Sequence, residues 1–237
     1  MVENTLREDG DAKASGVEAD DSARRSAKRA GKRWPIALGV IAVVLVIAGS
    51  GFFVWHEQPG FCNAICHTPM DPYLPTYEQE VGHPGVDKWG NEVNDTAGML
   101  APTHREQGVT CMGCHIPTLG EQVSEGMSWV TGDYEVKKTS AGALVPTEKD
   151  LAQLTAARDV SSDEFCLNER CHNMTRDDLI AATSDMEFNP HVPQHKKAEC
   201  SDCHKAHRQS VMTCTQCHAD AEVPAGWLSV KEANALS

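Results

Sequence analysis

The ten cysteines of this chain and five of its eleven histidines form five copies of one pattern, in which a histidine directly follows the second of two cysteines. Two thiols at such spacing can each bond one vinyl group of a porphyrin, while the adjacent imidazole binds the iron. The pattern therefore predicts an electron carrier with about five covalently attached c-type haems. We number the motifs along the chain: motif 1 is Cys62, Cys66 and His67; motif 2 is Cys111, Cys114 and His115; motif 3 is Cys166, Cys171 and His172; motif 4 is Cys200, Cys203 and His204; motif 5 is Cys214, Cys217 and His218.

Zinc sites and disulfides are the other common uses of paired cysteines. A zinc site needs four ligands, and it does not require a histidine immediately after the second cysteine of every pair. A disulfide framework leaves the five histidines unexplained. Motifs 2, 4 and 5 have the common gap of two residues, whereas the gap is three residues in motif 1 and four in motif 3. For these wider motifs, a role of Cys62 and Cys166 as structural thiols stays open.

Six histidines lie outside the motifs. Each haem iron has a sixth position that imidazole fills well, so we expect several of them to be distal ligands. His191, His195 and His207 surround motif 4, and His104 stands seven residues before Cys111. These four are the predicted distal ligands. The other two are His83, a weaker candidate in a Pro/Gly turn, and His56, which we expect at the membrane edge.

An uncharged segment of 19 residues, Ile36 to Val54, precedes the first motif and is flanked by Trp34 and Trp55. At 1.5 Å per residue its length nearly matches a hydrocarbon layer of about 30 Å, and tryptophan is enriched at both membrane interfaces. The sequence thus predicts a membrane-spanning helix at residues 34–55. We expect residues 1–33, which are polar and rich in alanine, to be disordered.

The basic residues before this helix predict its orientation. Positive charge favours the cytoplasmic side, so the haem-bearing part is expected outside the membrane. A cleavable signal peptide is the alternative, with Val46, Ile47 and Ala48 as a possible cleavage site, but its apolar region typically spans only about 7 to 15 residues. An uncleaved anchor is therefore favoured. The basic cluster is Arg24, Arg25, Lys28, Arg29, Lys32 and Arg33.

The remaining chain is strongly acidic. Subtracting the eight basic and seven acidic residues that precede Trp34 from the totals of 21 and 34 leaves 13 basic and 27 acidic residues, a net charge of −14. Such a charge excludes nucleic acid as a natural partner. Aromatic residues make up only 5% of the chain, so we expect porphyrins to supply much of the apolar interior.

The pattern beyond the anchor favours short helices and loops around a haem array, with little β structure. We expect a two-haem, membrane-proximal part at residues 56–133, a linker at 134–160 and a three-haem part at 161–237. Leu151, Leu154 and Ala157 have helical spacing, which predicts a connecting helix between Thr147 and Arg158. The fold class is thus a multihaem cytochrome c with one N-terminal transmembrane helix.

The C-terminal motifs resemble a known family. Asn189-Pro190-His191 through His195, followed by motif 4, His207 and motif 5, is similar to the tetrahaem domain of flavocytochrome fumarate reductases and small tetrahaem cytochromes over about residues 161–230. The resemblance implies bis-histidine haems completed by His191, His195 and His207. It also suggests a separate flavin enzyme as partner, because this chain has no Gly-rich nucleotide motif of its own.

The front half resembles the NapC/NirT/NrfH family of membrane quinol dehydrogenases, through motif 1 with Met70 behind it and through His104 ahead of motif 2. The resemblance implies electron uptake from menaquinol or ubiquinol, and it suggests Met70 as a ligand of the first haem. In this chain Met70 stands three residues after His67 instead of two. Charged residues near the first haem receive quinol protons in that family, and the candidates here are Asp71, Asp87, Lys88 and Asp95.

Together these features predict a membrane-anchored pentahaem cytochrome that oxidises quinol and relays electrons to an extracytoplasmic reductase. We expect that reductase to be a flavin enzyme acting on an activated C=C bond, as in fumarate-like acids or unsaturated lactones. Two alternatives stay open. One is a terminal reductase with a five-coordinate haem for a small oxyanion such as nitrite, and the other is a passive carrier that never oxidises quinol.

Overall fold

The computed structural model describes residues 15–193 and 198–236, with side chains described from Arg33 onward except those of Cys66, His67 and Ala157. The chain divides into two units, residues 1–54 and residues 55–237. We describe each unit by itself.

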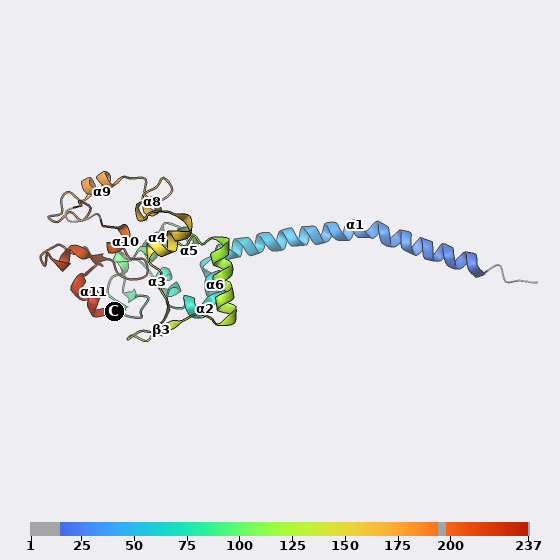
Figure 1. Cartoon of the computed structure of the whole chain (residues 1–237), viewed down its shortest axis with the longest axis horizontal. Helices are drawn as coiled ribbons and strands as arrows, with labels where there is room; N and C mark the ends of the chain where they lie inside the picture. Colours follow the sequence, from blue (N-terminus) through green and yellow to red (C-terminus); the bar gives the residue numbers. More distant parts are fainter. Residues whose placement is uncertain (1–14, 194–197, 237) are drawn as a thin grey trace, which may run out of the picture. The chain divides into compact units, whose positions relative to one another are not determined.

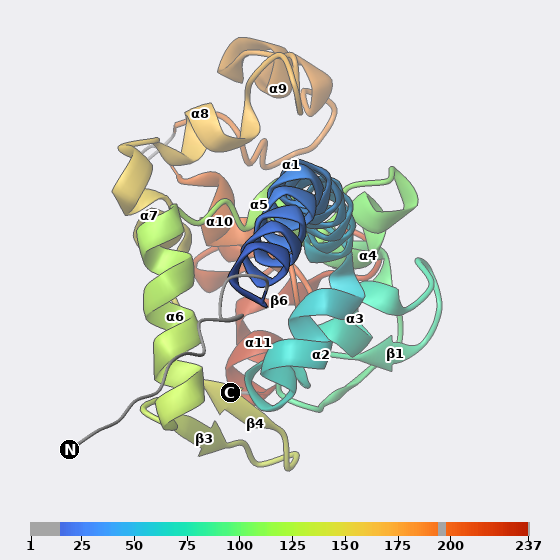
Figure 2. The same ribbon diagram turned by 90° about the vertical axis from the view of Figure 1, so that its right-hand side faces the viewer.

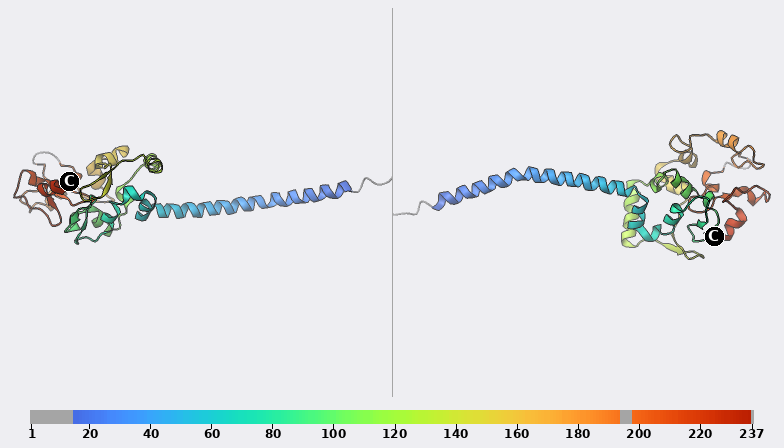
Figure 3. Two further views of the ribbon diagram at one scale, coloured as in Figure 1. Left: turned by 90° about the horizontal axis from the view of Figure 1, so that it is seen from below. Right: turned by 180° about the vertical axis from the view of Figure 1, so that it is seen from behind.

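The first unit consists of α1 (Ser15–His56), whose last two residues belong to the second unit. Figure 3 shows α1 as one continuous helix. Its segment Arg33–His56, 24 residues that include an 18-residue stretch with a mean hydropathy of 2.6, is the one helix in the described part of the chain that is long and apolar enough to cross a membrane. Residues 15–33 are also helical, although their composition predicts disorder. Their alanines, arginines and lysines are strong helix formers.

The second unit is built mainly from short helices, as expected. Its α-helices are α2 (Pro59–Met70), α3 (Leu74–Glu78), α4 (Leu100–Glu106), α5 (Cys111–Cys114), α6 (Leu119–Thr131), α7 (Leu151–Thr155), α8 (Ser162–Cys166), α9 (Arg176–Ala182), α10 (Cys200–Cys203) and α11 (Val230–Leu236). Its 3₁₀ helices are η1 (Thr96–Gly98), η2 (Ala156–Arg158) and η3 (Thr213–Gln216).

In the described part of the chain the strands are two or three residues long and pair in three separate sheets. Two sheets are antiparallel, β1 (Gly85–Val86) with β2 (Glu92–Val93) and β3 (Val136–Lys138) with β4 (Leu144–Pro146). The third is parallel, β5 (Val211–Met212) with β6 (Leu228–Ser229). The β3–β4 hairpin lies at the opposite edge of the second unit from α8 and α9 (Figure 1, Figure 2).

Side-chain caps define where several helices begin. In α6 the Thr118 hydroxyl accepts from the Glu121 N–H, while the Glu121 carboxylate accepts from the Thr118 N–H. The same reciprocal pairing starts α7, α8 and α9. Gly132, with φ at 71°, then ends α6 in the left-handed conformation that glycine adopts readily. Short helices in a loop-rich chain are thus fixed by local polar contacts.

The interior is small. Among the described residues the buried apolar side chains are Val93, Met99, Pro102, Val145, Val211, Met212 and Ala221. Met99 and Met212 are the largest of the fully buried side chains. A side-chain core of this size is modest for a unit of this length, which agrees with porphyrins forming part of the interior.

A segment of the C-terminal part, residues 204–210, is held against the front part by backbone hydrogen bonds. The carbonyl oxygens of Lys205, Ala206 and His207 accept from the N–H groups of Leu100, Ala101 and Lys88, at 2.9, 3.0 and 2.8 Å. The Ser210 N–H donates in turn to the Gly98 carbonyl at 2.9 Å. We call residues 204–210 the clasp, because they join two parts of the chain that are far apart in sequence.

Gly98 and Gly226 let the backbone pack tightly beside the clasp. A Cβ atom on Gly98 would lie 2.2 Å from the Gly226 carbonyl oxygen, which is far inside van der Waals contact. Gly226 has φ at +75°, a conformation that side chains disfavour. Both positions therefore require glycine.

Candidate haem-binding sites

Four motifs share one backbone closure. In each, the N–H of the histidine donates to the carbonyl oxygen of the first cysteine: His115 to Cys111 at 2.7 Å, His172 to Cys166 at 3.2 Å, His204 to Cys200 at 3.0 Å and His218 to Cys214 at 2.9 Å. This bond curls the motif into a single turn. Both thiols and the imidazole then arise from one compact segment, as attachment of a porphyrin with iron ligation requires.

Motif 3 reaches this closure despite its wider gap. The Asn168 side chain caps the loop, since its Oδ1 accepts from the N–H groups of Arg170 at 2.9 Å and Cys171 at 3.2 Å. Its Nδ2 donates to the carbonyls of Glu164 and Phe165, both at 3.0 Å. The two additional residues are thus absorbed in a polar turn, and Cys166 and His172 keep their relationship.

Motif 1 lies in α2, immediately after the apolar helix. The ring of Phe61 packs edge-on against Trp55 and His56, with centroid distances of 4.8 and 4.9 Å. Burial raises the pKa of the neighbouring Cys62 thiol. The side chains of Cys66 and His67 lie outside the described part of the structure, and Met70 is the last residue of α2. The ligation of Met70 to the first haem stays a prediction.

The thiols of successive motifs are electrostatic neighbours. Burial raises the pKa of Cys111, Cys114 and Cys214, and in each case a thiol of an adjacent motif raises it further. These thiols are Cys62 for Cys111, Cys171 for Cys114 and Cys203 for Cys214. Motifs 1 and 2, 2 and 3, and 4 and 5 therefore adjoin one another, as a continuous haem array would require.

Cys166 and Cys200 connect motifs 3 and 4. A hydrogen bond between the two thiols raises the pKa of Cys166 and lowers that of Cys200. Beside them, the Arg176 guanidinium pairs with Asp163 at 2.5 Å and donates to the Ala198 carbonyl at 2.8 Å. This ion pair ties α9 to α8 and to the segment that leads into motif 4.

His207 in the clasp is one of the predicted distal ligands. The Thr76 hydroxyl donates to the Tyr73 carbonyl at 2.7 Å, so it can only accept from His207 Nδ1, also at 2.7 Å. The proton is therefore on Nδ1, and Nε2 keeps its lone pair for a metal. Desolvation, together with His115 and Lys88, lowers the pKa of His207 to about 3, which keeps the ring neutral.

His104 and His191 also have a polar partner at Nδ1. His104 Nδ1 lies 2.8 Å from the Leu100 carbonyl, which can only accept. His191 Nδ1 lies 3.1 Å from the Thr183 hydroxyl, which has carbonyl acceptors of its own. The proton of His104 is therefore on Nδ1, which leaves its Nε2 for a metal. His195, the fourth predicted distal ligand, lies outside the described residues.

The two weaker histidine candidates lie in other surroundings. The His83 side chain is 64% exposed, with Nε2 at 3.8 Å from Glu80. His56 Nδ1 lies 3.3 Å from the carboxylate of its neighbour Glu57. No three His, Cys, Asp or Glu side chains converge as a metal site within the described residues.

The charged candidates for quinol protons differ in their surroundings. Asp71 is exposed after α2, and Lys88 forms an ion pair with Glu148 at 2.5 Å. The Glu148 carboxylate also accepts from the Tyr73 hydroxyl at 3.5 Å. Asp95 caps η1 by accepting from the Ala97 N–H.

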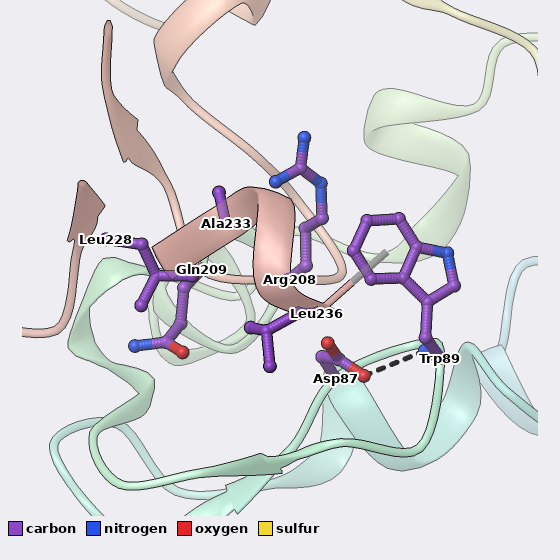
Figure 4. A pocket seen from close by; sticks show the side chains of 7 residues that line it. All are labelled: Asp87, Trp89, Arg208, Gln209, Leu228, Ala233 and Leu236. Carbon is purple, nitrogen blue, oxygen red and sulfur yellow. Dashed lines mark hydrogen bonds between the residues drawn. The ribbon is translucent and has the colours of Figure 1, made fainter. Parts of the chain in front are cut away.

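Asp87, the fourth of these candidates, is 4% exposed, and its carboxylate accepts three hydrogen bonds from Trp89 and Asn91. Figure 4 shows Asp87 facing Trp89 in a small pocket beside α11, with Arg208 near the indole. The Arg208 guanidinium stacks over that indole at 5.1 Å. Two of its polar side chains, Asp87 and Gln209, already have hydrogen-bond partners within the chain.

The fold and these motifs define the class. The chain is a multihaem c-type cytochrome, an electron-transfer protein that binds haem c covalently through cysteine pairs. A family model for cytochrome c3 matches residues 148–219. The chain is 66% identical, over 207 residues, to the cytochrome c-type protein Cgr1 of Eggerthella lenta, covering 87% of this chain and 92% of the relative. It therefore belongs to the family of that protein. No solved structure matches the chain.

The thiol pairs and imidazoles fit this cofactor. When bound, haem supplies one-electron redox chemistry, and the protein sets its potential through axial ligands, hydrogen bonds and burial. The contacts of Thr76 and Asn168 were not found from the sequence, because Thr76 lies in no recognisable motif and Asn168 is an intervening residue of motif 3 with no predicted role. The spacing of Asn168 inside the wide gap of motif 3 was the one available signal for a capped turn.

Proposed function

We propose that the chain is a membrane-anchored cytochrome that takes electrons from quinol, menaquinol or ubiquinol, and delivers them to a reductase outside the membrane. The observation that carries this proposal is the short separation in sequence between the apolar helix α1 and motif 1 in α2. Cys62 follows His56 by six residues, and Phe61 packs on Trp55 and His56. A helix that spans the bilayer would thus hold the first haem at the lipid surface, where a lipid-soluble quinol can approach.

The anchor and its orientation are part of the proposal. The large apolar side chains between Ile36 and Val54 are each more than half exposed. A lipid bilayer would bury them. The basic residues before Trp34 favour a cytoplasmic N-terminus and an extracytoplasmic haem unit. Cleavage at the helix would contradict this, and N-terminal sequencing of the mature protein would detect it.

Quinol oxidation releases protons as well as electrons, so it needs groups that accept protons. Asp71 and the Lys88–Glu148 pair are the best candidates, because Asp71 is exposed and the pair joins an acid and a base. Asp87 and Asp95 already hold local backbone structure. Asp71→Asn should therefore slow reduction by quinol without affecting reduction by dithionite.

The test uses full-length protein in liposomes with a menaquinol analogue. A chain that begins at Glu57 should lose most of the quinol rate while dithionite still reduces it. A matched control carries an unrelated membrane-spanning helix in place of residues 34–55. This control separates the effect of membrane attachment on the quinol rate from the effect of the native helix sequence. Equal quinol rates for the full chain and the Glu57 chain would overturn the proposal and leave the passive carrier.

The acceptor is proposed to be a flavin enzyme that reduces an activated C=C bond, such as that of a fumarate-like acid or an unsaturated lactone. The support is the resemblance of motifs 4 and 5 to cytochrome domains that serve such enzymes. The test is reoxidation of the reduced cytochrome by a flavoprotein encoded beside its gene, with and without the substrate. Direct reoxidation by nitrite in the absence of any partner would instead favour the terminal reductase.

A further inference from the structure

Two pairs of histidine rings are spaced as the two axial ligands of one iron are spaced. The ring centroids of His115 and His207 lie 6.2 Å apart, and those of His104 and His172 lie 6.0 Å apart. A metal bound at about 2 Å from a nitrogen of each ring places the two centroids about 6 Å apart. Each pair joins one motif histidine to one histidine outside the motifs.

We propose that His207 is the distal ligand of the motif 2 haem, opposite His115, and that His104 is the distal ligand of the motif 3 haem, opposite His172. This assignment rests on haem attachment to the motifs and is independent of quinol oxidation. Sequence proximity favours different pairings, because His207 follows His204 of motif 4 by three residues and His104 precedes motif 2. Each distal ligand is thus assigned to a haem other than the one whose motif lies nearest to it in the sequence.

The surroundings of both distal rings support the assignment. The hydrogen bonds of His207 to Thr76 and of His104 to Leu100 leave Nε2 of each ring as the metal-binding atom. Such a bond to the second nitrogen is the usual support of a metal-bound imidazole. Thr76 is fully buried, so its hydroxyl has no access to water as an alternative partner.

The backbone also places His207 beside motif 2. The His207 carbonyl accepts from Lys88, and its two preceding carbonyls accept from the start of α4. The clasp therefore holds His207 on the front part of the unit, although its sequence belongs to the C-terminal part. The Tyr73 ring packs edge-on to His207 at 5.1 Å and restricts the orientation of the imidazole.

The two pairs differ in ring angle, which provides a spectroscopic signature. The rings are inclined by 31° in the His115–His207 pair and by 68° in the His104–His172 pair. In low-spin ferric haems, nearly parallel imidazoles give a rhombic EPR spectrum, whereas strongly crossed imidazoles give one dominant low-field feature. The oxidised protein should show both kinds of signal.

The first test compares full-length His207→Ala and His104→Ala variants by EPR at low temperature. His207→Ala should convert one haem to high spin and remove the rhombic signal of the parallel pair. His104→Ala should remove the low-field signal of the crossed pair. The control is His83→Ala, an exposed histidine that should leave all signals unchanged. If His207→Ala left every haem low-spin, or removed the crossed signal, the assignment would be wrong.

The second test identifies the haem that His207 serves. Replacing Cys111 and Cys114 with Ala removes the motif 2 haem, and adding His207→Ala to this variant should produce no further high-spin haem. A new high-spin signal would show that His207 ligates a different haem. Adding His104→Ala to the same variant should instead produce one further high-spin haem, because the motif 3 haem is still present.

The third test does not depend on removing a ligand or a haem. Thr76→Val replaces the hydroxyl that accepts from His207 Nδ1 by a methyl group of similar size. The reduction potential of one haem should rise, because its imidazole loses electron-donating character, while all haems stay low-spin. Thr76→Ser should restore the wild-type value. Unchanged potentials in Thr76→Val would contradict the assignment of His207 as a ligand.

Discussion

The N–H of His172 donates to the carbonyl oxygen of Cys166 at 3.2 Å, and thereby closes a motif that is two residues longer than its neighbours. The corresponding bond in motif 2 joins His115 to Cys111 at 2.7 Å. The longer loop therefore presents the histidine in the same relation to the first cysteine. A wide cysteine gap alone does not argue against haem attachment.

We expect five covalent haems in each chain. Intact-protein mass and the pyridine haemochrome assay both measure this number. Replacing Cys166 and Cys171 together with Ala should reduce it by one, because motif 3 would lose both thioether bonds. A wild-type count of three would show instead that motifs 1 and 3 are unused, with Cys62 and Cys166 as structural thiols.

Gly98→Ala is expected to destabilise the haem unit by about 1–3 kcal/mol, because the new Cβ would overlap the Gly226 backbone. The matched control is Gly126→Ala in α6, where nothing lies within 4 Å of the added atom. Alanine should stabilise that helix by about 0.5–1 kcal/mol. Thermal unfolding of both variants measures the difference. Similar midpoints would mean that the contact between Gly98 and Gly226 is loose in solution.

The capping box of α6 predicts a loss of stability in acid. Hydrogen bonds from the Thr118 N–H and hydroxyl lower the pKa of Glu121 below its ordinary value of 4.5. The folded state favours the ionised carboxylate. The contribution of the Glu121 cap to the stability of the folded state is therefore complete above about pH 5, and it is lost as the pH falls through the lowered pKa. The unfolding midpoint should therefore decrease less between about pH 6 and pH 3 in Glu121→Gln than in the wild type. Equal pH dependence in both proteins would show that this cap contributes nothing.

The ion pair between Arg176 and Asp163 is expected to stabilise the junction of α8 with α9. Its side chains are only 22% and 21% exposed, so Asp163→Asn should cost about 1–2 kcal/mol by leaving a poorly solvated guanidinium without its counter-charge. The control is Lys149→Gln, which breaks the exposed pair with Glu125 and should cost less than about 1 kcal/mol. Denaturant unfolding compares them, and equal losses would contradict the expectation.

The fold class followed from the sequence because it depends on local signals. The motif pattern predicts where haem chemistry occurs, and the apolar run predicts the part of α1 between residues 34 and 55, although not its extension over residues 15–33. The β3–β4 hairpin was not predicted, because Val136–Lys138 and Leu144–Pro146 are too short for a visible alternation. The predicted connecting helix corresponds to α7 and η2, whose spacing was clear.

The surroundings of the distal histidines could not be read from the sequence. His207 was recognised as a candidate ligand, but its contact with Thr76 joins residues 131 positions apart. Long-range backbone bonds such as that between Lys88 and His207 depend on the path of the whole chain, which carries no local pattern. The same holds for the touching backbones of Gly98 and Gly226.

The clasp also has a consequence for the order in which the protein can form. Lys88 and His207 are separated by 119 positions, so the front part cannot obtain this bond until the ribosome has made nearly the whole chain. At about 5–20 residues per second, the delay is roughly 6–24 s. During that interval motif 2 exists without His207 beside His115. We therefore expect the thiols of motif 2 to be available for haem attachment before this contact forms.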